Sequence, residues 1–211
     1  MRIAVANTKG GVGKTTTSVH LATYLASIAP TLLIDGDQQE SAATWAAWRR
    51  TNQAIEGRQS PTTTCLRGPA IYDEGKTLSN AFSHTVVDVG GRDTPGLRNA
   101  LLLSELAIIP IGASNFDAAA MTDLLEVVDM AKDFNKKLQI KILLSRIDPR
   151  SIDTKDMLAF LLESNLNVLN TKICERVAFR RAIGEGCTVE EIGKDSQAVA
   201  EMAAFYKEIL G

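Results

Sequence analysis

The stretch that decides the fold is Lys9-Gly10-Gly11-Val12-Gly13-Lys14-Thr15-Thr16. It follows the apolar run 2–7 and precedes an amphipathic stretch that starts at residue 14, which predicts a strand, a glycine loop and a helix in succession. Glycines let successive backbone N–H groups turn toward phosphate oxygens, and the helix N-terminus adds the positive end of its dipole. The stretch therefore predicts a phosphate-binding loop.

Each side chain in this loop has a predicted contact with ATP or Mg²⁺. Lys14 places a cation on the β- and γ-phosphates, the Thr15 hydroxyl ligates Mg²⁺, and Thr16 adds a further phosphate contact. The backbone amides that cradle the phosphates are expected from Gly10, Gly11, Val12 and Gly13. A glycine turn that binds no ligand is the alternative interpretation, but it leaves the lysine and both threonines unexplained.

Apolar runs and helix-like stretches alternate along the rest of the chain, as in a parallel sheet with crossover helices. We expect a single domain over 1–211, an α/β three-layer P-loop NTPase with a mostly parallel twisted sheet flanked by helices. The predicted strands are 2–7, 31–35, 84–89, 105–111, 138–145 and 166–173. The predicted helices are 14–28, 41–52, 115–134 (with Asn115 or Asp117 as N-cap), 153–164, 177–184 and 196–210. The polar segment 53–70 is expected to be a surface connection.

Composition limits the classes of partner. The formal net charge of −2 provides no bulk attraction to nucleic acid, so any DNA binding requires a local basic patch. The three cysteines lack CxxC spacing, which favours reduced thiols in a cytoplasmic protein. No apolar run reaches the roughly 20 residues needed to cross a bilayer, and no signal peptide is evident.

Acidic residues follow two of the predicted strands. Strand 31–35 ends in Asp35-Gly36-Asp37-Gln38-Gln39, and Val86-Val87-Asp88 precedes Gly90-Gly91. An acid at the carboxyl end of a buried strand next to a phosphate loop can hold Mg²⁺ through a water, which is the role predicted for Asp88. Small residues at 90 and 91 suit a loop that senses the γ-phosphate. The alternatives are ordinary carboxylates at exposed strand ends and a flexible Gly-Gly turn.

The loop also departs from the usual pattern, which has glycine at position 8, where this chain has Thr8. With Lys9, the loop resembles the deviant form found in the ParA and MinD ATPases. A lysine that opens a loop is poorly placed for its own nucleotide. The resemblance implies that Lys9 crosses to the phosphates of a partner subunit in an ATP-sandwich homodimer, where a second cation stabilises the transferring phosphoryl group.

The same resemblance implies roles for the aspartates. Asp35 would lie near the metal shell, and Asp37 would orient or activate the attacking water. The expected catalytic residues are thus Lys9, Lys14 and Asp37, and the expected metal residues are Thr15, Asp35 and Asp88. Gln38 and the pair Gly90-Gly91 stand where this family commonly has prolines.

Two later segments resemble nucleotide-side regions of the family. Leu143-Leu144-Ser145-Arg146 implies adenine contacts by Ser145 and Arg146, with a plain loop as the alternative. The segment from Cys174 to Arg181 contains Arg176, Arg180 and Arg181, the densest cationic group of the second half. All three arginines are candidates for contact with DNA phosphates, and Arg176 and Arg180 are expected on one helix face. The alternative is solvated helix charges and a dimer interface.

The resemblance extends over almost the whole chain and is to short ParA proteins without an N-terminal DNA-binding domain. It implies an ATP-driven switch for DNA partition or cargo positioning, in which the ATP dimer binds DNA without sequence preference. A cargo-bound ParB-like or other adaptor would stimulate a slow intrinsic turnover, and the protein would be associated with the nucleoid.

Two other functions share this fold. A MinD-like membrane-cycling ATPase needs a basic amphipathic C-terminal helix, whereas the tail from Asp195 is alanine-rich and has a single lysine in its last helix, Lys207. A small-molecule ligase of the dethiobiotin synthetase type needs neither Lys9 nor the double aspartate. We therefore expect no membrane partner.

Overall fold

The computed structural model describes residues 1–90 and 94–211, apart from the side chains of 94, 115–120 and 123. The strands are β1 Arg2–Ala6, β2 Thr31–Asp35, β3 Thr62–Cys65, β4 His84–Val89, β5 Leu106–Ile111, β6 Gln139–Ile147 and β7 Val168–Cys174. The helices are α1 Lys14–Ala26, α2 Ser41–Thr51, α3 Ala70–Ser79, α4 Thr94–Leu103, α5 Asn115–Phe134, α6 Ile152–Glu163, α7 Val177–Gly184, α8 Val189–Ile192 and α9 Ser196–Leu210, with a short 3₁₀ turn at Gln53–Ile55.

Within these residues the strands form one sheet in the order β3-β2-β4-β1-β5-β6-β7, and every pairing is parallel. The predicted α/β class is confirmed, and the sheet is parallel throughout rather than mostly so. Buried parallel strands are apolar on both faces, and β2 has all five of its residues buried.

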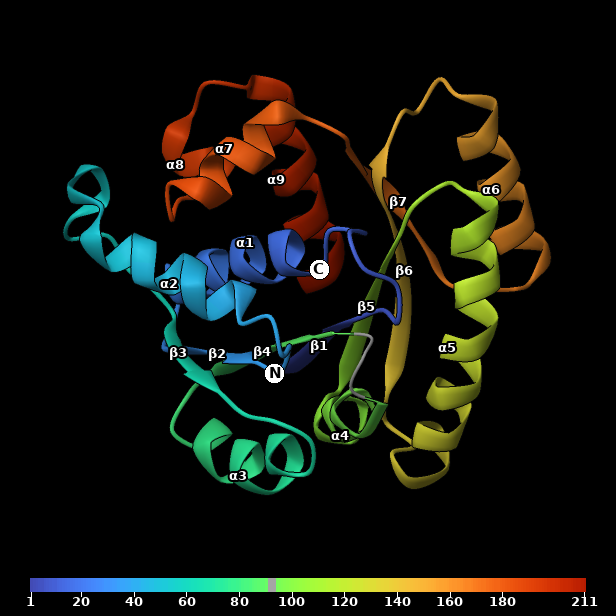
Figure 1. Ribbon diagram of the computed structural model, residues 1–211, viewed down its shortest axis with the longest axis horizontal. Coiled ribbons are helices and arrows are strands. Elements are labelled where there is room, and N and C mark those ends of the chain that lie inside the picture. The colour runs from blue at the N-terminus through green and yellow to red at the C-terminus, as the bar shows by residue number, and fades with distance from the viewer. Residues whose placement is uncertain (91–93) are drawn as a thin grey trace.

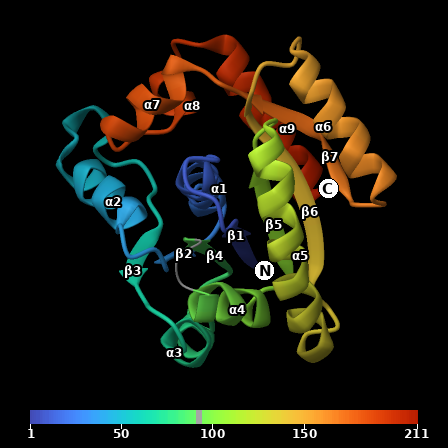
Figure 2. The same ribbon diagram turned by 45° about the vertical axis from the view of Figure 1, so that its right-hand side comes forward.

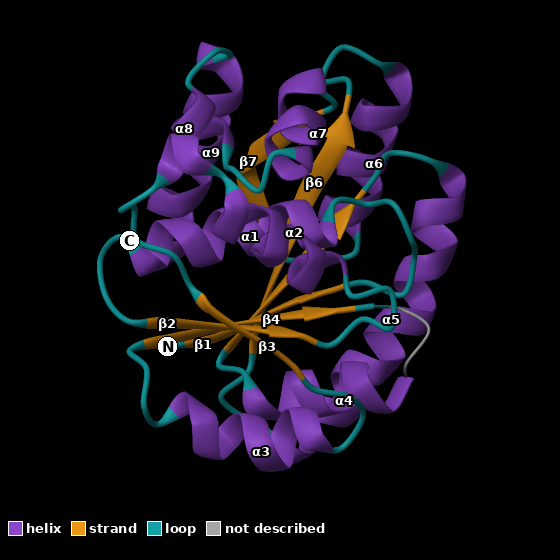
Figure 3. Ribbon diagram, turned by 60° about the vertical axis from the view of Figure 1, so that its left-hand side comes forward, coloured by secondary structure: helices purple, strands orange, loops and turns teal. Residues whose placement is uncertain are grey.

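Two helical layers enclose the sheet (Figure 1). Ile3 and Val5 face a core shared with α1, α2, α7 and α9, whereas Ala4 and Ala6 face a core shared with α3, α4, α5 and α6. Figure 3 shows the sheet nearly edge-on, with α1 and α2 on one side and α3 and α4 on the other. In Figure 2, α7 and α8 lie beside α2 and next to α1. Successive side chains of each strand point to opposite faces of the sheet, so both faces are apolar and each is covered by a layer of helices.

One sequence expectation is wrong. The segment 53–70, expected to be a surface connection, contains β3, which pairs with β2 along residues 62–65. Thr62 is exposed, and Thr63 and Thr64 are half-buried, because β3 is an edge strand with one open side. Helices α3, α4 and α8 were also not predicted.

Two predicted features lie outside the described part of the chain. They are the backbone of Gly91 and the N-cap side chain assigned to Asn115 or Asp117.

No described helix is both long and apolar enough to cross a lipid bilayer.

Candidate functional site

The glycine loop connects β1 to α1 and is held from both sides. The Asn7 side chain donates to the Pro110 carbonyl at 2.7 Å and accepts the Lys9 backbone N–H at 2.8 Å. Gly13 has a φ of 92°, in the left-handed region. A Cβ at Gly13 would lie 2.6 Å from Ser145 Oγ, so glycine is also required by close packing against β6. Asn7 was not assigned from the sequence.

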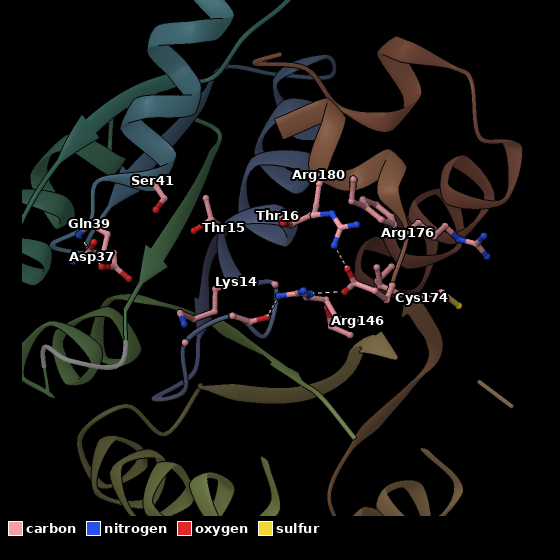
Figure 4. A pocket seen from close by; sticks show the side chains of 17 residues that line it. Lys14, Thr15, Thr16, Asp37, Gln39, Ser41, Arg146, Cys174, Arg176 and Arg180 are labelled. Carbon is pink, nitrogen blue, oxygen red and sulfur yellow. Dashed lines mark hydrogen bonds and ion pairs between the residues drawn. The ribbon is translucent and has the colours of Figure 1, made fainter. Parts of the chain in front are cut away.

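A cavity of about 350 Å³ opens beside this loop, within the range typical of small-molecule sites. Its walls come from the loop and α1, from the segment after β2, from the ends of β6 and β7, and from α7 (Figure 4). The lining residues predicted for the nucleotide or its hydrolysis are Gly10, Gly11, Gly13, Lys14, Thr15, Thr16, Asp37, Ser145 and Arg146. The segment expected on the nucleotide side contributes Cys174, Glu175, Phe179 and also Arg176 and Arg180, which were predicted to contact DNA. Gln39, Ser41 and Ile173 line the cavity as well and were not predicted.

Lys14 is buried at the floor of the cavity, with a relative exposure of 8%. Its ammonium group donates to the Lys9 carbonyl at 2.7 Å. Burial lowers the pKa of Lys14, and the carboxylates of Asp88 and Asp37 act in the opposite direction. The loop thus holds a poorly solvated cation at the point where a phosphate group would neutralise it.

Asp88 is the buried, next-to-last residue of β4 and contacts α1. Its Oδ2 accepts the Thr15 hydroxyl at 2.7 Å, and its Oδ1 accepts the Ser18 hydroxyl at 3.0 Å. Burial raises the pKa of Asp88 to about 7, against the hydrogen bond from Thr15. Ser18 was not predicted, although it lies on the helix face of Thr15, three residues later.

The shifted pKa of Asp88 predicts a pH-dependent stability. The folded, metal-free protein holds this proton more tightly than the unfolded chain, so its free energy of unfolding should fall as pH rises from about 4 to about 7, by about 1 kcal/mol per unit. Above that range the contribution should be constant. Urea unfolding at pH 5 to 8 with a chelator measures the slope, and Asp88→Asn is the control that lacks it. Equal slopes for the two proteins would contradict the assignment.

Asp35 and Asp37 lie at the end of β2 but differ in their surroundings. Asp35 is fully buried, and its carboxylate accepts the backbone N–H of Asp37 at 3.0 Å and of Ala43 at 2.8 Å. Burial raises its pKa, and these two amides oppose the shift. Asp35, predicted near the metal shell, thus has both oxygens engaged in holding the loop to α2.

Asp37, in contrast, faces the cavity. Its Oδ1 accepts the Gln39 backbone N–H at 2.9 Å. Its other oxygen lies so close to Gly90 that a Cβ at position 90 would overlap it. The glycine after β4 is therefore needed for the observed position of Asp37.

An ionic chain crosses the wall of the cavity that β6, β7 and α7 provide, drawn as dashed lines in Figure 4. Arg146, with a left-handed φ of 55°, donates to the Gly11 carbonyl and to Glu175 Oε2. Arg180 donates to the other Glu175 oxygen at 3.1 Å. Arg146 lowers the pKa of Glu175. The chain connects the glycine loop to α7.

The arginines predicted to share a helix face do not do so. Arg176 is the N-cap of α7, with extended backbone, and its side chain donates to Glu201 on α9 at 2.7 Å and to Gln197 at 2.8 Å. It therefore points away from Arg180, which bonds Glu175 (Figure 4). Arg181 is exposed.

Lys9 is not among the described residues that line the cavity of its own chain. Its ammonium group donates to the Ser114 hydroxyl at 3.1 Å, in the segment before α5. The lysine thus lies at the outer side of the loop.

Comparison with known proteins agrees with this geometry. The chain matches the CobQ/CobB/MinD/ParA nucleotide binding domain over residues 3–189. It is 27% identical to the maintenance of carboxysome distribution protein A of Halothiobacillus neapolitanus over 94% of this chain and 91% of that one. It is 30% identical to the chromosome-partitioning ATPase Soj of Thermus thermophilus over 72% and 71%.

Solved structures share the fold at low identity. Apo McdA from Cyanthece superposes with a TM-score of 0.75 at 18% identity, over 99% of this chain and 98% of that one. A putative plasmid partition protein of Borrelia burgdorferi, bound to AMPPNP, gives 0.73 at 21% identity, over 99% and 98%. With the family match covering most of its length, the chain belongs to the CobQ/CobB/MinD/ParA family of nucleotide-binding domains.

Proposed function

We propose that this protein is an Mg²⁺-dependent ATPase switch that dimerises with ATP and serves DNA partition or the positioning of another intracellular cargo. The observation that carries the proposal is the pair of loop lysines. Lys14 is buried at the floor of the cavity, while Lys9 lies on the outer side of the same loop. A hydrolase that acts as a monomer needs only the first of these cations.

The nucleotide part of the proposal is supported by the loop, the buried lysine and the AMPPNP complex of the Borrelia neighbour. The phosphates would lie against Lys14 and the backbone of residues 10–16, and the base would lie toward Arg146 and Phe179. Asp37 would orient the attacking water, because its carboxylate lines the cavity. The carboxylate of Asp35, in contrast, accepts backbone N–H groups with both oxygens.

The residues present fit Mg²⁺. Asp88 is a buried carboxylate whose two described partners are hydroxyl groups, an all-oxygen set of the kind that this ion prefers. Thr15 and Asp88 would hold it, directly or through water, and few protein ligands are needed because Mg²⁺ keeps several waters. When bound, the ion neutralises charge on the phosphate oxygens.

Lys9→Ala tests the dimer. The variant should bind ATP normally, because Lys9 does not line its own cavity. Its ATP-dependent dimer should weaken about 10- to 100-fold if one charge-assisted contact per subunit is lost. Analytical ultracentrifugation with a non-hydrolysable ATP analogue measures both proteins, with the exposed Lys136→Ala as control. An unchanged dimer with Lys9→Ala would refute the sandwich arrangement.

DNA binding would be non-specific and carried by phosphate contacts. Of the three predicted arginines, Arg176 and Arg180 are held by Glu201 and Glu175, so we assign the larger share to Arg181, which lines a second hollow with Lys194. A gel shift on random DNA should appear with ATP and disappear with ADP, and Arg181→Ala should weaken it.

A cargo-bound ParB-like or other adaptor would stimulate turnover, and the ATP state would associate with the nucleoid.

The MinD-like alternative receives no support from α9. Its apolar face packs into the core through Ala198, Met202, Phe205, Tyr206 and Ile209. Docking of this helix on a membrane would require it to leave that core. Co-sedimentation with anionic liposomes in ATP would favour the alternative.

A further inference from the structure

A buried histidine lies behind the cavity and connects α1 to α8. His20 has no exposed surface, and its Nε2 accepts the backbone N–H of Val189 at 3.1 Å. Its proton is therefore on Nδ1, which donates to the Thr16 carbonyl at 2.7 Å. Burial lowers the pKa of His20, against the nearby Glu190 carboxylate, so the ring is neutral. It bridges two backbone groups that are far apart in sequence, and one of them belongs to the phosphate loop.

The next link is a buried ion pair. Glu191 closes the capping box of α8 by accepting the Thr188 N–H at 2.8 Å, and it accepts two hydrogen bonds from the Arg49 guanidinium at 2.7 and 2.8 Å. The two charged side chains are 8% and 4% exposed. Arg49 also donates to the Gly186 carbonyl, and a Cβ at Gly186 would overlap the Arg49 backbone. The end of α2 is thus fixed against the segment between α7 and α8.

The other end of α2 holds the loop that carries Asp37. The Ala43 N–H donates to Asp35 at 2.8 Å, and the Thr44 N–H donates to the Glu40 carbonyl at 2.8 Å. An α-helix is rigid over this length, so a shift at Arg49 moves the start of the helix as well. The contacts therefore run without a gap from Thr16 to the loop of Asp37.

Stability alone does not account for the ion pair. The cost of removing two charges from water roughly cancels their attraction, so apolar side chains of similar size are commonly as stabilising at such a position. Arg49 and Glu191 make directional hydrogen bonds to each other and to groups around them, and these add one defined placement of α2 against α8.

We propose that His20, Glu191 and Arg49 form a relay of positioning residues that fixes Asp37 relative to the phosphate loop. None of the three lines the nucleotide cavity, so each acts through its neighbours. The inference rests on the proposed ATPase function, because Asp37 is placed for the attacking water. A misplacement of about 1 Å at a reacting group is enough to slow a reaction by up to about 100-fold.

Two substitutions each break one link at His20. His20→Asn retains a donor near the Nδ1 position, for the Thr16 carbonyl, but its side chain does not reach the Val189 N–H. His20→Gln reaches the Val189 N–H but loses the hydrogen bond to Thr16. Both variants should lower kcat about tenfold, while the Kd for ATP changes less than about threefold. Thr23→Val is the control, since it removes a buried hydroxyl bonded only within α1, to the Val19 carbonyl at 2.7 Å. It should leave kcat unchanged.

Arg49→Met with Glu191→Met tests the relay without leaving a buried charge unpaired. This double variant should keep the thermal midpoint of the wild type within a few degrees and still lose kcat about tenfold. Tryptophan emission supplies a second readout in a Trp48→Phe background, because the remaining Trp45 ring lies 5.3 Å from the Arg49 guanidinium. The change in its emission on ATP binding should be lost in the double variant.

The outcomes distinguish a failure of the relay from a failure of the proposed ATPase function. Folded relay variants that hydrolyse ATP at the wild-type rate, with the wild-type emission change, would refute the relay and leave the ATPase intact. A loss of ATP affinity that accounts for the whole loss of rate would refute it too, because the residues would then serve binding. A wild-type protein that binds ATP without hydrolysing it would refute the proposed function, and the relay with it.

Discussion

Lys14→Ala is expected to lose ATP binding while keeping its fold. The ammonium group is buried and donates a hydrogen bond to the Lys9 carbonyl, and burial lowers the pKa of Lys14. The loop therefore holds a charge that it solvates poorly, and phosphate oxygens would relieve that cost. Charge-assisted hydrogen bonds to two phosphates contribute enough that their loss should weaken binding at least about 100-fold.

The fold should tolerate this substitution better than most buried ones. Removing a desolvated cation removes a cost as well as a contact, so the thermal midpoint of the nucleotide-free protein should change by only a few degrees. Differential scanning fluorimetry measures that midpoint with and without Mg·ATP, since a ligand that binds the native state raises it. Lys9→Ala, in the same loop, should keep the ATP-dependent rise. A Lys14→Ala protein that is still stabilised by ATP would show that the cavity is not the nucleotide site.

The central strands could be predicted because both of their faces are buried, and such strands consist almost entirely of apolar residues. This holds for Leu32-Leu33-Ile34 and Ala107-Ile108-Ile109. Strand β3 has no apolar run, because Thr62-Thr63-Thr64 lies at an open edge of the sheet. Helix α3 was not predicted, and it contains Gly75, a residue that is unfavourable inside helices. A Cβ at this position would lie 3.1 Å from Leu103, so the glycine allows close packing with α4 and does not end the helix.

Residues with a role fixed by local spacing could be assigned to the cavity from the sequence. Lys14, Thr15 and Thr16 follow from the strand–loop–helix context, Asp37 follows from the resemblance to ParA, and the structure gathers all four around one hollow. Other features depend on partners distant in sequence. The bond from Arg49 to Glu191 spans 142 positions, and that from Arg146 to Gly11 spans 135. Spacing alone carries no signal for such pairs. Asp35 is a different case, because its partners Asp37 and Ala43 are close in sequence, and the resemblance directed its role to the metal instead.

Asp37→Ala is expected to bind ATP and fail to hydrolyse it. The carboxylate lines the cavity but is not part of the proposed phosphate site, which consists of Lys14 and the loop backbone. Its loss should therefore leave the Kd for ATP within about threefold and lower kcat by about 100- to 10,000-fold, the range for a residue that takes or orients a proton. Single-turnover phosphate release, measured beside binding of a fluorescent ATP analogue, separates the two effects.

The contact with Gly90 supplies an independent test of where that carboxylate must be. Gly90→Ala leaves Asp37 in the chain but places a methyl group where its Oδ2 lies, so the carboxylate must shift. We expect kcat to fall at least about tenfold with ATP binding retained. Gly184→Ala is the matched control, because a Cβ at position 184 meets nothing within 4 Å. The double variant Asp37→Ala with Gly90→Ala should be no slower than Asp37→Ala alone, since both changes act on one group. Additive losses would mean that Gly90 acts by another route, and full activity of Asp37→Ala would remove the proposed water-orienting role altogether.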